Sequence, residues 1–485
     1  GGRGAGPIIK IPNRMFQNKY IVRYLAASVK GRRAGKEGAH AMFTTVKKAA
    51  SPARSPYLAT LGGLAVPVML ENLSQIFLGT VDTYFAGQIG DNAIAAINVT
   101  NMFMNLFVTV FTAFGVGIMV MISSALGEGD TAKANRLVRQ AVLLGLGVGA
   151  GFGLLNFFCR RPFLRMAGAE GEILELGLTY YLAVCVPCVF LCLTLILAGG
   201  LKAARNTRAS MRAALAANLF NAVFDALFVS LGLGVLGLGL ATTLARAFNL
   251  ALLVGLYRRG VTPLRLDARG WKPEPATMKA LAGYSGPIML TQLSARLAIL
   301  IHGSLILHLG AVYYTANSIA TQLDEYACIP SAGFEAATAT MVSTSLGAGR
   351  REDAARYTRT AFFATALAMT AAGAVLAIFA LPLTGLFTQT GQIRQMVAQV
   401  LTFMVLFNWT SALSHILTSA VQGTGDSRYP LWVTLAGNIL MRLAAGYLLA
   451  YWLGWGLIGI WTGIVLDFLL RGTLLGARFI RQYKA

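Results

Sequence analysis

The chain has 485 residues, of which 56% are hydrophobic and only 12% are charged, and its formal net charge is +22. Water-soluble domains carry charge on about a quarter of their residues, so this composition excludes an ordinary soluble fold. In a soluble protein such a positive charge would indicate a nucleic-acid partner. Here the basic residues lie between apolar segments, so we expect no nucleic-acid partner and interpret the charge as a determinant of membrane orientation.

Residues 1–56 differ from the remainder of the chain, because they hold twelve Lys and Arg but a single acid, Glu37. We interpret them as a flexible basic tail in the cytoplasm, which could also lie on anionic lipid headgroups. A mitochondrial presequence is the alternative, since such segments are also rich in Arg and poor in acids.

Twelve apolar segments of about 20 residues or more follow, and each is long enough to cross ~30 Å of hydrocarbon as a helix. In the first half they cover residues 58–83, 93–123, 137–158, 174–199, 213–233 and 235–257. In the second half they cover residues 280–308, 315–346, 359–381, 398–421, 431–453 and 456–479. The sequence therefore predicts an all-α polytopic membrane protein with twelve transmembrane helices.

Basic residues in the connections predict the orientation of these helices. With the tail inside, the even-numbered connections carry 18 Lys and Arg and the odd-numbered connections carry 4. Cytoplasmic loops are enriched in Lys and Arg, so we expect both termini to be cytoplasmic. We further expect the membrane to be the bacterial inner membrane. The polar connection 258–279 is predicted to be a cytoplasmic linker between an N-terminal lobe, 57–257, and a C-terminal lobe, 280–485.

The two halves repeat at a constant offset of 220 residues. Residues 67–70 (PVML) face 287–290 (PIML), and the loop 126–129 (LGEG) faces 346–349 (LGAG). Each repeat contains an even number of helices, so both halves enter the membrane from the same side. This predicts two six-helix bundles related by a pseudo-two-fold axis along the membrane normal, and rocking of one bundle against the other would give alternating access.

Several motifs resemble the multidrug and toxic compound extrusion (MATE) family. Residues 81–90 (VDTYFAGQIG) are similar to the family's VDTxxxGxxG signature. The loops 126–130 and 346–350 resemble its LGAG loop, and residues 422–428 (QGTGDSR) resemble its QGxGDTR loop. The resemblance covers residues 57–480 and implies export of organic, often cationic, compounds without a cofactor other than a coupling ion, H⁺ or Na⁺.

Acids inside apolar helices are the candidates for the coupling site, because a charge at the bilayer centre costs at least ~2.5 kcal/mol. Two polar stripes at helical spacing indicate a lined cavity: Glu71, Gln75 and Asp82 in the first helix, and Asn218, Asn221 and Asp225 in the fifth. Oxygen ligands suit Na⁺, and two nearby carboxylates suit a proton carrier, so both ions stay open. The alternative for Asp82 and Asp225 is a buried pair that only fixes helix packing. Asp467, near the end of the last predicted helix, is expected to snorkel.

In the DinF-type branch of the MATE family, the resemblance implies a cation site made of four residues: Asp82, Asn221, Asp225 and Thr243. At offset 220 these positions face His302, Met441, Ala445 and Gly463, so the oxygen cluster occurs only in the first half. The NorM-type branch uses a Glu of the seventh helix, but Arg296 stands near that place. Glu325 and Glu335 are the remaining candidates for an ion or substrate site in the second half.

The preferred function is therefore cation-coupled antiport of small organic, cationic substrates by a membrane protein that we expect to be monomeric. The alternative within the same architecture is a flippase for lipid-linked saccharides, whose cavities are strongly basic. Deep within the predicted helices, acids outnumber the basic residues, which include Arg246, Arg296 and Arg442, and this favours cationic cargo. An intramembrane enzyme would need a reactive constellation, and we find none in the sequence.

Overall fold

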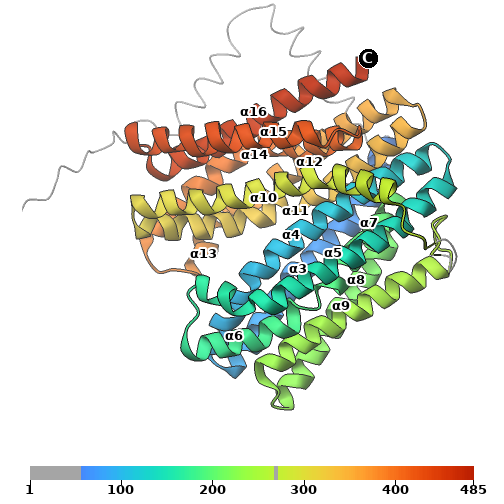
Figure 1. The fold of residues 1–485 in the computed structure, drawn as a ribbon. Coiled ribbons are helices and arrows are strands. Elements are labelled where there is room, and N and C mark those ends of the chain that lie inside the picture. Colours follow the sequence, from blue (N-terminus) through green and yellow to red (C-terminus); the bar gives the residue numbers. More distant parts are fainter. Residues whose placement is uncertain (1–55, 267–270, 485) are drawn as a thin grey trace, which may run out of the picture. The chain divides into compact units, whose positions relative to one another are not determined.

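A computed structural model of the chain describes residues 56–266 and 271–484. Residues 1–55, which make up nearly all of the predicted tail, lie outside this range, as does Arg269 of the predicted linker. All regular secondary structure in the described residues is helical (Figure 1). The prediction of an all-α protein is therefore confirmed.

In the described residues up to 266 there are seven helices, which provide six spans. They are α3 (Pro56–Ile89), α4 (Asp91–Gly127), α5 (Thr131–Met166), α6 (Gly171–Val184), α7 (Cys188–Ala203), α8 (Thr207–Ser230) and α9 (Gly234–Arg258). The fourth predicted span is broken into α6 and α7, which are bent by 44° relative to one another. Pro187 stands directly before α7 and supplies the physical reason, because proline cannot donate a helical hydrogen bond.

The second half also provides six spans. Its helices are α10 (Pro275–Leu309), α11 (Ala311–Gly347), α12 (Arg351–Ile378), α13 (Ala380–Gly385), α14 (Gly391–Gly423), α15 (Arg428–Ala436), the π-helical η1 (Gly437–Ala445) and η2 (Leu448–Trp452), and α16 (Gly456–Lys484). The helices from α15 to η2 form a single span, Arg428–Trp452. The last residues of the predicted linker are helical, because α10 already begins at Pro275.

Ten described helices are long and apolar enough to cross a membrane, and the bent pair α6–α7 makes an eleventh span. The remaining long helix is α11, with 37 residues, which is less apolar because it carries Asp324, Glu325 and Glu335. Each of the twelve predicted segments therefore corresponds to one straight, bent or broken helix of the described chain.

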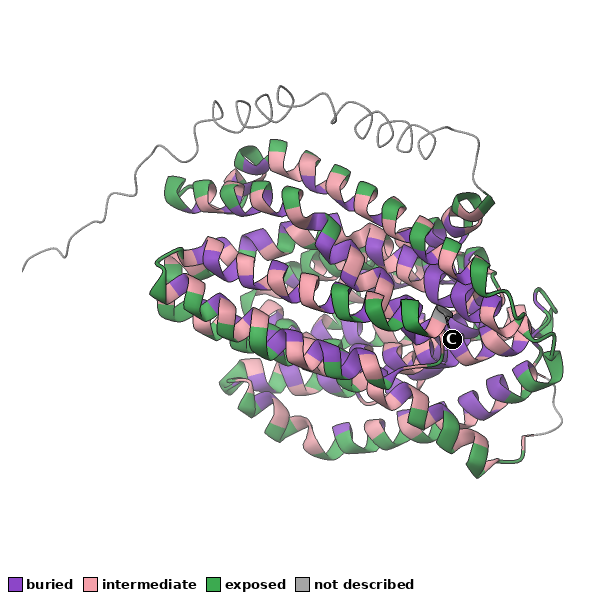
Figure 2. Cartoon of the chain, turned by 90° about the horizontal axis from the view of Figure 1, so that it is seen from above, coloured by how far each residue is buried: buried purple, intermediate pink, exposed green. Residues whose placement is uncertain are grey.

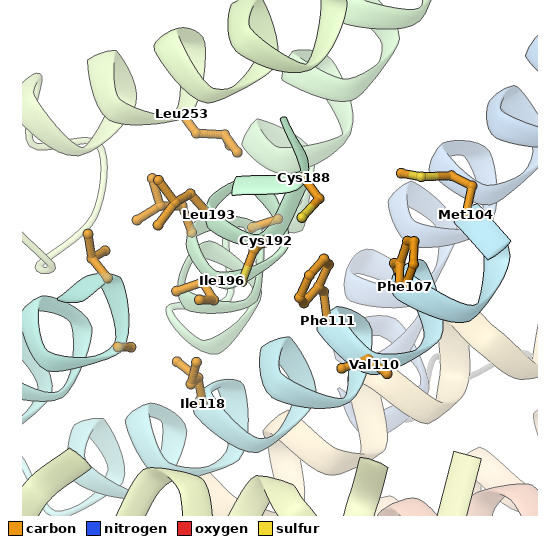
Figure 3. Packing of buried hydrophobic residues seen from close by; sticks show 14 of the residues in the cluster. Met104, Phe107, Val110, Phe111, Ile118, Cys188, Cys192, Leu193, Ile196 and Leu253 are labelled. Atoms are coloured by element: carbon orange, nitrogen blue, oxygen red, sulfur yellow. The ribbon is translucent and has the colours of Figure 1, made fainter. Parts of the chain in front are cut away.

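The helices form two bundles, which we call the first bundle (α3–α9) and the second bundle (α10–α16) (Figure 1). In the first bundle Phe107 and Phe111 of α4 pack near Cys188 and Cys192 of α7 (Figure 3). The cysteines therefore act as small apolar side chains here. Buried residues follow the inner faces of the helices (Figure 2). Large apolar side chains such as that of Trp452 stay exposed. An apolar outer surface is what a bilayer-embedded protein requires.

The bundles meet along a seam between α4 and α11, at the ends of these helices that carry the LGEG and LGAG loops. A Cβ atom added to Gly127 would lie 2.2 Å from the carbonyl oxygen of Thr344, and one added to Gly347 would lie 2.3 Å from that of Ser124. The offset of 220 pairs Ser124 with Thr344 and Gly127 with Gly347. The contact is therefore reciprocal about the pseudo-two-fold axis, and it requires glycine on both helices.

Candidate cation site

Two carboxyl groups and an amide meet between α3 and α8. Asn221 and Asp225 lie one turn apart on α8, and each is only 1% exposed. The Asn221 Nδ2 donates a hydrogen bond of 2.7 Å to Asp225 Oδ2. Asp82 extends from α3, and its carboxyl lies within electrostatic range of that of Asp225. The structure thus brings together three of the four residues predicted for the cation site.

One oxygen of each carboxyl group has unused capacity as an acceptor. Oδ1 of Asp82 and Oδ1 of Asp225 are both buried, and neither has a hydrogen-bond partner in the described part of the chain. Leaving a buried polar atom unpaired costs about 1–3 kcal/mol. A proton shared by the two carboxyls, or a metal ion between them, would remove that cost.

The ligand set of the site favours a hard cation over a transition metal. The described residues contain no group of three or more His, Cys, Asp or Glu side chains that could hold a metal ion. A metal ion here would therefore need neutral oxygen atoms, such as that of Asn221, in addition to the two carboxylates. Oxygen-only coordination is typical of Na⁺ and other hard cations.

Thr243, the fourth predicted residue, lies on α9 and turns toward the end of α6. Its hydroxyl donates a hydrogen bond of 2.5 Å to the carbonyl oxygen of Ala183. The hydroxyl proton is therefore already used in a hydrogen bond, but the hydroxyl oxygen can still bind a cation. The structure thus places Thr243 against α6.

Arg246 is a charged residue of the site that the sequence did not assign. It lies one turn after Thr243 on α9, and its Nη1 donates a hydrogen bond of 3.0 Å to the carbonyl oxygen of Val184. Its guanidinium also lies within electrostatic range of Asp82. The sequence signal was a basic residue inside an apolar helix, three positions after a predicted ligand. Arg246 offsets part of the negative charge of the carboxyl pair.

The other polar residues of the two stripes join helices and do not reach the carboxyl pair. Lys202 Nζ lies 3.1 Å from Glu71 Oε1, and this ion pair connects α7 to α3. Asn218 Nδ2 donates a hydrogen bond of 2.8 Å to Ser74 Oγ, which connects α8 to α3. Gln75 is exposed. Some residues of the two predicted stripes therefore join neighbouring helices, and the others form the candidate cation site.

In the second bundle the predicted residues are dispersed. Glu335 Oε1 lies 3.0 Å from His415 Nδ1, and about a third of each side chain is exposed. Glu325 on α11 and Arg296 on α10 are both exposed. These residues do not form an oxygen cluster like the one between α3 and α8.

The prediction that Asp467 snorkels from a helix end is wrong. Asp467 is 0% exposed, and Arg471 Nε donates a hydrogen bond of 2.5 Å to its Oδ1. Arg442 Nε from η1 lies 3.2 Å from Asp467 Oδ2. The helix α16 continues to Lys484, so Asp467 lies well inside it and packs against η1. One carboxylate is thus enclosed by two guanidiniums.

A family model named MatE matches the chain twice, over residues 67–227 and 287–448. The two matches begin 220 residues apart, which is the offset of the internal repeat. Together they cover more than half of the chain.

Two curated proteins illustrate the similarity. The chain is 24% identical over 424 residues to the probable multidrug resistance protein NorM of Thermotoga maritima, covering 85% of this chain and 89% of that protein. It is 27% identical over 426 residues to the protein of the same description from Neisseria meningitidis serogroup A, covering 84% and 90%.

Two solved structures share the fold. One is described as the outward-facing conformation of a multidrug resistance MATE family transporter, with a TM-score of 0.82, 20% identity and coverage of 88% of this chain and 95% of that one. The other is a transporter of the MOP superfamily from Pyrococcus furiosus, with a TM-score of 0.81, 21% identity and coverage of 88% and 96%.

Proposed function

Because the chain belongs to the MatE family of transporters, we propose that it is a cation-coupled antiporter that exports small organic, cationic compounds by alternating access. The coupling ion is H⁺ or Na⁺, bound between α3 and α8. The proposed ligands are Asp82, Asn221 and Asp225, with Thr243 as a further oxygen ligand. We further propose a monomer with both termini in the cytoplasm.

The observation that carries this proposal is the carboxyl pair of Asp82 and Asp225, with one unpartnered, buried oxygen on each. Buried acids inside spanning helices are costly unless a cation or a partner compensates them. Uptake of a cation on one side of the membrane and its loss on the other would change that compensation once in each transport cycle. Cation and cargo then need only opposite preferences for the two states of the protein.

The distribution of the intramembrane arginines supports cationic rather than anionic cargo. Arg442 and Arg471 share the carboxylate of Asp467 in a cluster of nearly buried side chains. Arg246 donates to a backbone carbonyl and lies within the electrostatic field of Asp82. These three guanidiniums already interact with groups inside the protein, whereas a flippase for pyrophosphate-linked saccharides would need them for its cargo. Arg296 is the exception, since it is exposed.

The test is efflux of ethidium from proteoliposomes under an imposed H⁺ or Na⁺ gradient. The variants Asp82→Asn and Asp225→Asn are compared with wild type at matched reconstitution. Asp130→Asn is the matched control, because Asp130 caps α5 by accepting from Lys133 N, and asparagine caps a helix equally well. We expect gradient-driven efflux to be lost in both site variants and retained in the control, and the effective gradient identifies the ion.

Normal efflux by both site variants would overturn the proposed site. In that case Glu335→Gln would test the second bundle, where Glu335 pairs with His415. Absence of efflux by wild type under every gradient would instead contradict the proposed cargo class and leave the family assignment unchanged.

A further inference from the structure

We infer that a groove between α8 and α9, at the end of the first bundle that carries the arginine-rich loops, binds one anionic phospholipid. Its phosphate would lie between Arg208, Arg212 and Arg259, and an acyl chain would follow the groove into the bilayer. The inference is independent of the coupling ion and of the cargo.

The groove is a cavity of about 750 Å³ with arginines at one end and apolar walls along the remainder. Arg208 and Arg212 are one turn apart and share a face of α8, and Arg259 directly follows α9. Ala213 and Ala216 continue the same face of α8. From Arg208 to Ala216 the helix rises about 12 Å, which is enough to lead from the headgroup region into hydrocarbon.

Small residues make the groove deep. Besides the alanines of α8, Ala251 and Gly255 line it from α9. A Cβ atom added to Gly255 would meet nothing within 4 Å, so the groove is open space at this point. An apolar channel beside spanning helices would be filled by lipid, because water gains no hydrogen bonds from alanine and leucine side chains.

The charge at the mouth of the groove selects the headgroup. No acidic residue lines the cavity. Arg208 and Arg212 are exposed, as is Arg259, and none of the three forms an ion pair with a described residue. Guanidinium groups bind phosphate oxygens through paired hydrogen bonds, and basic pockets between spanning helices on the cytoplasmic side suit anionic headgroups. A zwitterionic headgroup would bring its own cation close to the arginines.

The internal repeat supplies a built-in comparison. At offset 220, Asn206 faces Asp426, and Arg258 faces Arg478. In the second bundle Asp426 Oδ2 accepts a hydrogen bond of 2.8 Å from Arg478 Nη2, so an acid stands at this position of the repeat. In the first bundle the neutral Asn206, which lines the groove, occupies the equivalent place. The first groove therefore lacks the acid that the second bundle has at this position, and its arginines can meet the charge of an anionic lipid.

Native mass spectrometry of the detergent-solubilised full chain tests the inference. The measurement is the fraction of protein that retains phosphatidylglycerol, compared with the fraction of protein that retains phosphatidylcholine. A hydrogen bond between one groove arginine and the phosphate contributes about 1 kcal/mol net, which corresponds to about fivefold in binding. We expect Arg212→Gln to weaken phosphatidylglycerol binding about fivefold, and the triple variant with Arg208→Gln and Arg259→Gln by about 100-fold.

Two further variants separate charge from structural damage. Asn206→Asp keeps the cap of α8, in which the Asn206 side chain accepts from Ala209 N, but adds the counter-charge found in the second bundle. It should weaken phosphatidylglycerol binding without changing the thermal stability of the protein in detergent. Arg258→Gln removes the same charge one residue away from Arg259, outside the groove, and should leave binding unchanged.

The inference is overturned if the triple variant retains as much phosphatidylglycerol as wild type, or if Arg258→Gln weakens binding as much as Arg212→Gln. Competition by soluble glycerol 3-phosphate at the concentration of the lipid would show a phosphate site in place of a lipid site. Equal retention of phosphatidylcholine and phosphatidylglycerol would show an apolar groove without headgroup selection, which also contradicts the inference.

Discussion

Replacing Gly127 by alanine should force the two bundles apart at the seam between α4 and α11. The added Cβ atom would lie 2.2 Å from the carbonyl oxygen of Thr344, and this distance must increase by 0.8 Å to reach the 3.0 Å that real Cβ contacts respect. The obstacle is backbone on a long helix, so no side-chain rotation can relieve it. Gly347→Ala should act in the same way, because its Cβ atom would meet the carbonyl oxygen of Ser124.

The free-energy cost falls on one state of the transporter only. Overpacking a tight contact costs about 1–3 kcal/mol. That cost is present while the two bundles touch at this seam and disappears when they separate here. The equilibrium between the two states should therefore move toward separation by a factor of about 5 to 150.

Distances between spin labels measure this shift. Ala132 at the start of α5 and Arg351 at the start of α12 are both exposed and lie beside the seam loops. Cysteines at these two positions, in a background without the five native cysteines, report the separation of the bundles. We expect Gly127→Ala to increase the population at longer distances.

Gly147→Ala is the matched control for this measurement. Gly147 lies inside α5, and a Cβ atom added there would meet nothing within 4 Å. Its distance distribution should equal that of wild type. Wild-type distributions in both Gly127→Ala and Gly347→Ala would refute the reasoning, because the seam would then tolerate the added atoms without moving the helices.

Three further variants concern stability. Asp467→Asn leaves two nearly buried guanidiniums without their carboxylate and should cost roughly 3–5 kcal/mol, seen as a lower thermal unfolding midpoint in detergent. Asp426→Asn breaks a more exposed ion pair and should cost about 1 kcal/mol or less; equal losses would contradict the assigned role of burial. Gln140→Leu removes two hydrogen bonds to the backbone at residues 272–274 and should make proteolysis of that connection roughly 30-fold faster. An unchanged cleavage rate would show that the connection is held by other contacts.

The fold was predictable because its signals are local and repeated. Apolar length defines the spans, and the offset of 220 relates the halves without reference to any tertiary contact. The exceptions have physical reasons in the sequence. Pro187 breaks the fourth span. The helix α11 is less apolar than the other spans because it carries three acids. The exact geometry of η1 was not predictable, since the switch from α to π hydrogen bonding depends on packing against α16.

The candidate cation site was predictable only in part. Asn221 and Asp225 lie one turn apart on the same helix, so their contact follows from helical spacing alone. Contact between Asp82 and Asp225 depends on how α3 lies on α8, and there the sequence offered two polar stripes and a family resemblance. Arg246 shares a helix face with Thr243, but no pattern in the sequence showed that this face approaches Asp82.

The prediction about Asp467 was wrong although the predicted bounds of its helix, 456–479, already placed it near the middle of the span. Arg471, one turn later, was the available signal, since Asp and Arg four residues apart on a helix can form an ion pair. The second partner, Arg442, comes from another span, and only the tertiary structure reveals it.

The helix α3 physically connects the candidate cation site to the second bundle. Its first part packs on the second bundle, with Leu61 and Leu64 in one cluster with Phe334 and Met341. Its later part lies on the first bundle, where the carboxyl of Asp82 interacts with the site on α8. Pro67 stands between these two parts and removes a helical hydrogen bond there. A change of charge at Asp82 therefore acts on a helix that is held by both bundles and is weakest between its two attachments.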